Sequence, residues 1–194
     1  MTLIHPYNAI KNAAEKYSVN DSYEFNITYP EFYIKESWST HWSKKWYNTP
    51  YYVNPFENCF FEKVNKFFGT YIDDCNSFYI GTDSTMSGES RKFKIILSSK
   101  VLQNFLDIMG FQSIENDPTN KKGLTNENWQ NKLEVYVWIG NDGYIVKMET
   151  NLKDLYDELY KDYYFNSMPL YLEFSNINNV NISLLEGALT AEFK

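Results

Sequence analysis

Apolar side chains recur at helical spacing in four segments of the chain. The first segment begins at Pro6, a residue favoured in the first helical turn, and continues with Ile10 and Ala13 on one side. In the second segment, Asn54 is a suitable helix cap and Gly69 is a typical C-terminal stop. The whole pattern predicts helices over residues 6–17, 54–69, 98–110 and 151–164.

Alternation of apolar and polar side chains marks the strands. It is clearest on either side of residues 140–143, whose Gly-Asn-Asp-Gly sequence is typical of a hairpin turn. An earlier hairpin is expected to have a long polar loop at residues 82–91. The alternation predicts strands at residues 23–29, 77–81, 92–97, 133–139, 144–149 and 169–174.

The order of these elements predicts the class of fold. A hairpin followed by a helix and a further strand is typical of α+β proteins, in which helices lie on one face of a sheet. We therefore expect an α+β fold with a mostly antiparallel sheet built from hairpins and about four helices packed on it. The length of 194 residues fits a single globular domain spanning residues 1–194. Residues 111–131 carry little periodic signal and are expected to form a mobile loop.

An aromatic segment follows the first predicted strand. Trp38, Trp42 and Trp46 recur every four residues, which places them on one face of either a helix or a strand, so the spacing does not choose between the two. Core packing is the simpler interpretation, because large aromatic side chains dominate protein cores. Clustered tryptophans also favour a protein interface or a surface on which sugars stack. The three tryptophans are therefore candidate partner-binding residues.

The composition excludes several classes of protein. Hydrophobic residues make up 43% of the chain, which is too many for a disordered protein. The two cysteines, Cys59 and Cys75, fit neither a disulfide scaffold nor a metal-binding spacing. No run approaches the roughly 18 apolar residues that span a bilayer, and the first residues lack the apolar stretch of a signal peptide. We expect a cytoplasmic protein that does not bind membranes.

Motifs for catalysis and cofactor binding are missing from the sequence. Neither histidine, His5 or His41, lies in a metalloprotease motif, and there is no glycine-rich phosphate loop or Gly-x-Ser-x-Gly turn. The acids Asp73, Asp74, Asp83 and Glu89 could gather around a hard cation, but they lack the spacing of a calcium-binding loop. We therefore expect no catalytic residue, no cofactor and no metal. A hydrolase built on dispersed carboxylates, however, would leave no local motif.

Negative charge is concentrated in the second half of the chain. The formal net charge is −7, and residues 98–194 hold 14 acidic and 8 basic side chains, so −6 of the total lies there. Acids recur on the polar side of the helix predicted at residues 151–164. A solvated helix face is the simpler interpretation of this row. The functional interpretation is an acidic surface that attracts a basic partner. The row consists of Asp154, Asp157, Glu158 and Asp162.

These features favour a binding protein without catalytic activity. We expect an inhibitor of the immunity or antitoxin type, which occludes a basic, nuclease-like protein through its acidic C-terminal surface. The negative charge argues against direct binding of nucleic acid, because phosphates require cationic partners. In its composition, which is acidic and rich in Tyr, Trp and Asn, the chain resembles the immunity proteins of bacterial polymorphic toxin systems. That resemblance assigns no functional residues.

Two other classes of function stay open on the sequence alone. A carboxylate-dependent hydrolase predicts a pocket in which an Asp or Glu with a raised pKa lies beside a tryptophan. A module that binds a small ligand or a carbohydrate would use the Trp- and Tyr-rich segment as its cleft. The oligomeric state is also open, since an exposed tryptophan cluster favours self-association.

Overall fold

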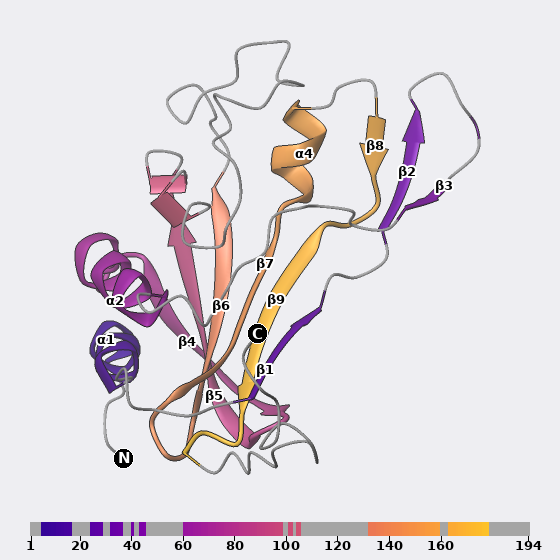
Figure 1. Cartoon of the computed structure of the whole chain (residues 1–194). Helices are drawn as coiled ribbons and strands as arrows, with labels where there is room; N and C mark the ends of the chain where they lie inside the picture. The colour runs from indigo at the N-terminus through magenta and orange to yellow at the C-terminus, as the bar shows by residue number, and fades with distance from the viewer. Residues whose placement is uncertain are drawn as a thin grey trace, which may run out of the picture.

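Antiparallel strands form two sheets within the described part of the chain, shown as a computed structural model in Figure 1. The structure describes residues 5–16, 24–28, 32–36, 40, 43–45, 60–98, 101–102, 104–105, 132–159 and 163–178. In spatial order, the larger sheet consists of β1 (Glu24–Thr28), β9 (Pro169–Ser175), β7 (Ile145–Asn151), β6 (Leu133–Gly140), β5 (Gly88–Leu97) and β4 (Ser77–Thr85). The smaller sheet consists of β3 (Ser43–Lys45), β2 (Phe32–Glu36) and β8 (Tyr163–Phe165).

Helices α1 (Pro6–Lys16) and α2 (Phe60–Tyr71) cover one face of the larger sheet (Figure 1). Helix α1 packs against α2 and also contacts β4, β6 and β7. Its buried residues are Ile10, Ala13 and Ala14, which confirms the helix predicted from their spacing.

The core of the larger sheet lies between the central strands and these helices. One row of side chains crosses four strands through paired positions, with Phe93 opposite Val137, Val137 opposite Met148, and Met148 opposite Leu172. All four side chains are at most 2% exposed. Burying a side chain of this size stabilises the fold by about 1.5–3 kcal/mol, so this row is a main source of stability.

The predicted turn between β6 and β7 is confirmed. The Gly143 N–H donates to the Gly140 carbonyl at 2.9 Å, and Gly143 has a φ of 87°, a conformation that favours glycine. Lys16, at the end of α1, donates to the Asp142 carbonyl and lies 4.3 Å from the centroid of the Tyr144 ring. The end of α1 is thereby fixed to this turn.

Helix α2 extends beyond its predicted stop. Val64 and Phe68 are buried as predicted, but Gly69 has no left-handed φ and the helix continues to Tyr71. The chain turns afterwards because the Asp73 carboxylate accepts backbone N–H groups two and three residues later, at 2.7 and 3.0 Å. An Asx turn rather than a glycine therefore ends this helix.

The loop predicted at residues 82–91 is wrong. Strands β4 and β5 continue through these polar residues and meet in a tight turn at Met86 and Ser87. The polar side chains of this segment are typical of a loop in the sequence. In the structure they form hydrogen bonds with one another inside the hairpin. The Thr85 hydroxyl, for example, lies 3.1 Å from the Ser90 hydroxyl and accepts the Ser87 N–H at 3.2 Å.

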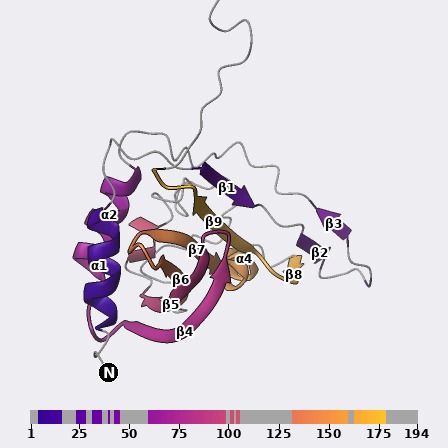
Figure 2. The same ribbon diagram turned by 90° about the horizontal axis from the view of Figure 1, so that it is seen from below.

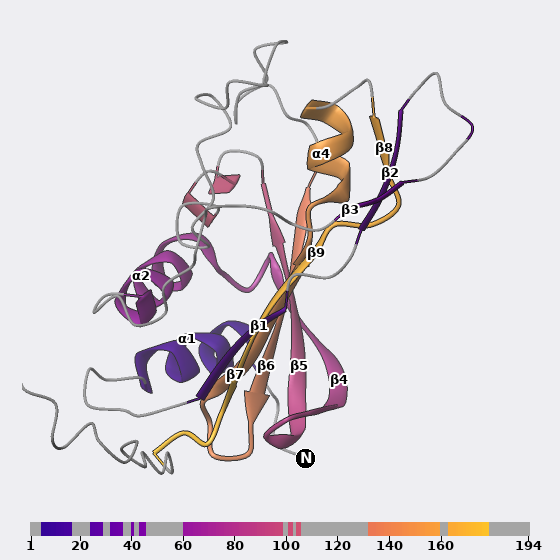
Figure 3. The same ribbon diagram turned by 45° about the vertical axis from the view of Figure 1, so that its right-hand side comes forward.

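The long β4–β5 hairpin bends back over the face of the sheet opposite α1 and α2. Figure 2 shows β4 curving around the other strands, and Figure 3 shows this bend on the far side from the two helices. The hairpin tip reaches β9, where the Met86 N–H donates to the Glu173 carboxylate at 2.8 Å and the Ser87 hydroxyl donates to the Phe174 carbonyl at 3.0 Å. A register shift between Tyr79 and Gly81 accompanies the bend, as expected of a β-bulge.

The helix predicted over residues 151–164 is shorter in the structure. Helix α4 spans Lys153–Leu159, and the chain then returns as β8, which pairs with β2. The Asp157 carboxylate accepts the Phe165 N–H at 3.0 Å, and this contact holds the returning strand against the helix. Apolar spacing alone could not reveal this reversal.

The α+β class and the antiparallel sheet are confirmed, but the helix count is not. The described residues form three helices with defined bounds, rather than about four. Within the helix predicted over residues 98–110, residues 101–102 and 104–105 are described and have helical backbone. The loop predicted at residues 111–131 lies outside the described residues.

Candidate functional site

The acidic residues predicted to bind a partner have different environments in the structure. Asp154 is exposed in the first turn of α4. Asp157 and Glu158 are half-buried on the same helix. Asp162 lies outside the described residues. The structure therefore presents Asp154 directly to solvent, whereas Asp157 also has internal partners.

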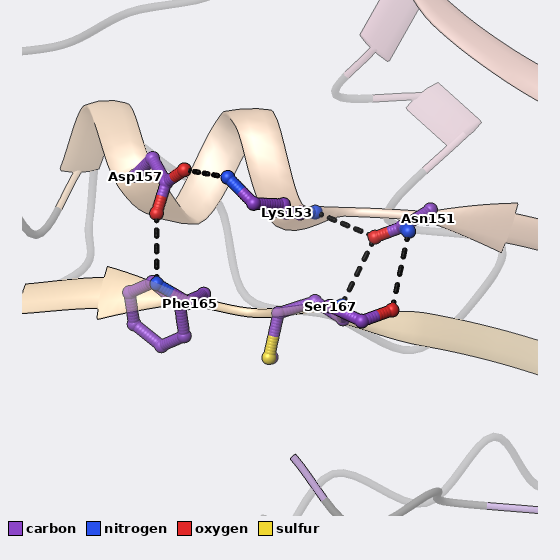
Figure 4. Close-up of polar contacts among 6 residues, drawn as sticks. Asn151, Lys153, Asp157, Phe165 and Ser167 are labelled. Atoms are coloured by element: carbon purple, nitrogen blue, oxygen red, sulfur yellow. Dashed lines mark hydrogen bonds and ion pairs between the residues drawn. The ribbon is translucent and has the colours of Figure 1, made fainter. Parts of the chain in front are cut away.

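Asp157 joins α4 to β8. One carboxylate oxygen forms an ion pair with Lys153, one helical turn earlier, and the other accepts the Phe165 N–H (Figure 4). The ring of Phe165 packs edge-on against Tyr156 at 5.6 Å between centroids. Asp157 is thus a structural residue of this part of the fold, in addition to its negative charge.

Asn151 caps the start of α4 and ties it to the residues that precede β9. Its side-chain oxygen accepts the Lys153 N–H and the Met168 N–H, both at 3.0 Å, and its amide donates to the Ser167 hydroxyl at 3.3 Å (Figure 4). A cap of this kind typically stabilises a helix by about 1 kcal/mol. The two anchors, at Asn151 and Asp157, hold the helix that carries Asp154 in one orientation.

The three candidate tryptophans, Trp38, Trp42 and Trp46, lie outside the described residues. The short segment between the last two, Ser43–Lys45, forms strand β3 and pairs with β2. At this point of the chain the backbone is therefore extended, although the spacing of the tryptophans suited a helix equally well.

A second polar site, which the sequence did not predict, lies under the bent β4–β5 hairpin. We call it the Trp138 cluster, and it consists of Trp138 with Asp83, Lys92 and Lys147. Trp138 lies on the sheet face away from α1 and α2, yet it is only 1% exposed because the hairpin covers it. Its indole N–H donates to the Asp83 carboxylate at 3.3 Å. The ammonium nitrogens of Lys92 and Lys147 each lie 4.5 Å from the centroid of its ring.

Aromatic and charged residues extend this cluster across the sheet. The ammonium nitrogen of Lys92 lies 5.0 Å from the centroid of the Tyr136 ring, and that of Lys147 lies 5.2 Å from the centroid of the Tyr171 ring. Lys92 and Asp83 form an ion pair at 3.7 Å. Each cation over an aromatic ring contributes roughly 0.5–2 kcal/mol, depending on its desolvation. The face is therefore a network of paired charges on aromatic rings.

The electrostatics of this face keep its carboxylates ionised. The hydrogen bond from Trp138, a backbone hydrogen bond and the nearby lysines hold the pKa of Asp83 below its usual value. Hydrogen bonds from Lys94 and Tyr136 likewise lower the pKa of Glu134. The Tyr136 phenol donates to the Glu134 carboxylate at 2.7 Å, and this hydrogen bond raises the pKa of Tyr136 to about 12.

This geometry bears on the hydrolase alternative. A general acid needs a carboxyl group with a raised pKa, and the hydrolase alternative predicts such a group beside a tryptophan. The described carboxyl group in contact with a tryptophan is that of Asp83, and its pKa is lowered. The Trp138 cluster can hold charge in place, but it does not supply a protonated acid at neutral pH.

The acids considered for a cation site are separated by the fold. Asp73 folds back on its own turn, where it accepts the N–H groups of Cys75 and Asn76. Asp83 instead faces Trp138. In the part of the chain that the structure describes, no group of three His, Cys, Asp or Glu residues is placed to hold a metal ion.

The outer edge of the larger sheet is apolar and exposed. Phe78, Tyr79 and Ile80 follow one another in β4 and are 41%, 40% and 46% exposed. Among the described strands, β4 pairs with β5 alone. The sequence signal for this feature is the run of three large apolar residues, which interrupts the alternation expected of a half-buried strand.

Comparison of the chain with protein-family models, with curated proteins and with solved structures found no match. None of the helices in the described ranges has the length and apolar character needed to cross a membrane.

Proposed function

We propose that the protein is a non-catalytic, cytoplasmic binding protein that occludes a basic protein partner, as an inhibitor of the immunity or antitoxin type. The interface is the acidic C-terminal surface on α4, with Asp154, Asp157 and Glu158 as its described contact residues. The proposed interface also includes four residues that lie outside the described part of the chain, which are Trp38, Trp42, Trp46 and Asp162.

The observation that carries this proposal is the placement of Asp154 on a short helix fixed at both ends. Asp154 is exposed, while Asn151 and Asp157 use their own polar atoms to hold α4 against β8 and the residues that precede β9. A rigid support for an exposed charge lowers the conformational-entropy cost of binding a partner. The net charge of −7 adds long-range attraction for a basic protein.

The mechanism would be occlusion. Carboxylates on α4 stand in for the phosphates of the partner's substrate and pair with the cations that bind them. Electrostatic steering raises the association rate, which for oppositely charged proteins reaches about 10⁸–10⁹ M⁻¹s⁻¹ at low salt. The lowered pKa of Asp83 supports a binding role over acid catalysis at the Trp138 cluster.

The test is the association rate of the purified partner with two variants. Asp154→Asn combined with Glu158→Gln removes charge from α4 and keeps Asp157, on which the local fold depends. We expect association roughly tenfold slower at low salt, with a flatter salt dependence. The matched control is Glu15→Gln combined with Asp74→Asn, which removes the same charge from two exposed positions away from α4 and leaves the Asp73 turn intact. Equal rates for the two variants would contradict the assignment to α4.

A further inference from the structure

The tip of the β4–β5 hairpin covers Trp138 but brings almost no apolar surface of its own. We call residues 82–89 the flap. Its one large apolar side chain is that of Met86, which is 60% exposed, whereas Trp138 beneath the flap is 1% exposed. Segments with few buried apolar contacts open at a lower free energy than the whole fold. Burial of its own side chains therefore contributes little to holding the flap in place.

Polar contacts at the tip fix the flap to β9. The Met86 N–H donates to the Glu173 carboxylate at 2.8 Å, and the Ser87 hydroxyl donates to the Phe174 carbonyl at 3.0 Å. Hydrogen bonds of this kind make a modest net contribution to stability, because water binds the same groups once they separate. These two contacts form a latch that can be released without disturbing the core.

The backbone pairing of the flap is internal. Ser84 lies opposite Glu89 and Thr85 lies opposite Gly88 in the β4–β5 ladder. The Thr85 hydroxyl also donates to the Gly88 carbonyl at 3.0 Å. None of these pairs involves β9, so the flap can lift off the sheet and keep its hairpin structure.

Both strands of the hairpin have a suitable hinge where the flap begins. In β4 the register shifts between Tyr79 and Gly81, and Gly81 has a φ of 127°. A Cβ added at Gly81 would meet nothing within 4 Å, so the glycine is needed there for its backbone conformation and not for space. In β5 the last residue paired with β6 is Ser90, which lies opposite Gly140.

We propose that the flap is a hinged lid over the Trp138 cluster, which opens about the bulge at Gly81 while the rest of the sheet stays folded. In the closed state the Asp83 carboxylate accepts the Trp138 indole N–H. Opening separates these two groups and exposes the Trp138 ring together with the ammonium groups of Lys92 and Lys147 that lie over it. The lid thus controls access to a second surface, separate from the one proposed on α4.

Hydrogen exchange followed by NMR on the full chain tests this lid through three N–H groups. The Met86 N–H reports the latch, and the Trp138 indole N–H reports the surface beneath the flap. The Ile96 N–H, which donates to the Asn76 carbonyl at 2.9 Å, reports the part of the same hairpin on the other side of the bulge. The spectrum of Trp138→Phe identifies the indole signal.

A lid that moves as a unit gives the two flap reporters the same protection factor. We expect the protection factors of the Met86 N–H and the Trp138 indole N–H to agree within about threefold, and to be at least about tenfold lower than that of Ile96. Low concentrations of urea should reduce the protection of Ile96 more steeply, because opening of the lid exposes less surface than unfolding does.

Two variants of the flap with the same chemical change locate the latch. Ser87→Ala removes the hydroxyl that donates to the Phe174 carbonyl, whereas Ser84→Ala removes an exposed hydroxyl from the same flap. Ser87→Ala should lower the protection of the Trp138 indole N–H about threefold or more, and Ser84→Ala should change it less than about twofold. Circular dichroism verifies that both variants fold.

Three outcomes would overturn the proposal. Equal protection of all three groups would show that the flap opens only when the whole protein unfolds. A weakly protected Met86 N–H beside a Trp138 indole N–H as protected as Ile96 would show that the tip frays and uncovers nothing. Equal effects of the two serine variants would show that the contact with Phe174 is not a latch. None of these measurements involves Asp154 or Glu158, so their result is independent of the function proposed for α4.

Discussion

At the scale of single residues, Trp138 shows how a tertiary contact changes the character of a side chain. Its position in β6 places it with Glu134 and Tyr136 on the face away from the helices. The bent hairpin then covers it and brings Asp83 to its indole N–H. Local pattern could place Trp138 on this face, but it could not predict burial by a hairpin whose polar residues were expected to form a loop.

The lowered pKa of Asp83 predicts a specific dependence of stability on pH. Because the carboxyl group has a lower pKa when folded than when unfolded, it stabilises the fold above the unfolded value of about 4, and this contribution is lost as pH falls through the folded pKa. Asp83→Asn should therefore lower the free energy of unfolding at pH 7, and the difference from the wild type should shrink in acid.

Urea unfolding at pH 7 and at about pH 3 measures this difference. Asp154→Asn removes a charge from the exposed surface of α4 and is the control for the change in net charge. Since Glu134 also has a lowered pKa, the wild type should lose stability in acid in any case. A difference between Asp83→Asn and the wild type that is the same at both pH values would contradict this interpretation of Asp83.

Asp157 and Asp154 should respond differently to the same substitution. Asp157→Ala removes the acceptor of the Phe165 N–H and the partner of Lys153, and we expect it to destabilise the protein by about 1–3 kcal/mol. Asp154→Ala should change stability by less than about 0.5 kcal/mol, because Asp154 is exposed. Similar losses for the two variants in chemical denaturation would show that the anchor between α4 and β8 is not at Asp157.

At the scale of secondary-structure elements, patterns of period two were more reliable than the endpoints of helices. Strands β6, β7 and β9 lie close to their predicted positions, because their alternating residues face a helix-covered core on one side. The end of α2 and the length of α4 were mispredicted, because they depend on side-chain contacts with backbone groups, from Asp73 in one case and Asp157 in the other. Such contacts leave no periodic signal.

Burial along the β4–β5 hairpin gives a direct test of which side of it belongs to the core. Phe93 is fully buried, and Phe93→Ala should destabilise the protein by about 3–5 kcal/mol through lost burial and a cavity. Phe78, on the neighbouring strand, is 41% exposed, and the same truncation there should cost less than about 1 kcal/mol. Thermal or urea unfolding distinguishes the two. Equal losses would mean that something covers Phe78 in solution.

At the scale of the whole molecule, charge and exposed apolar residues are unevenly distributed. Of the net charge of −7, −6 lies in residues 98–194. The structure adds three exposed apolar residues in β4, which are Phe78, Tyr79 and Ile80. The sequence placed them in a strand of the predicted hairpin, but it could not establish that they are exposed. The class of fold could be predicted from the order of hairpins and helices. The acidic residues of α4 could also be named from the sequence, whereas the Trp138 cluster and the exposed apolar residues of β4 required the three-dimensional arrangement.

Affinity capture from the cells that produce the protein, followed by mass spectrometry, tests most directly whether α4 binds a basic protein. The tagged wild type and the tagged Asp154→Asn/Glu158→Gln variant serve as baits at low and at high salt. We expect the wild type to recover a basic protein in stoichiometric amount at low salt, and we expect both high salt and the variant to reduce its recovery. Recovery of no basic protein, or equal recovery by both baits, would contradict it.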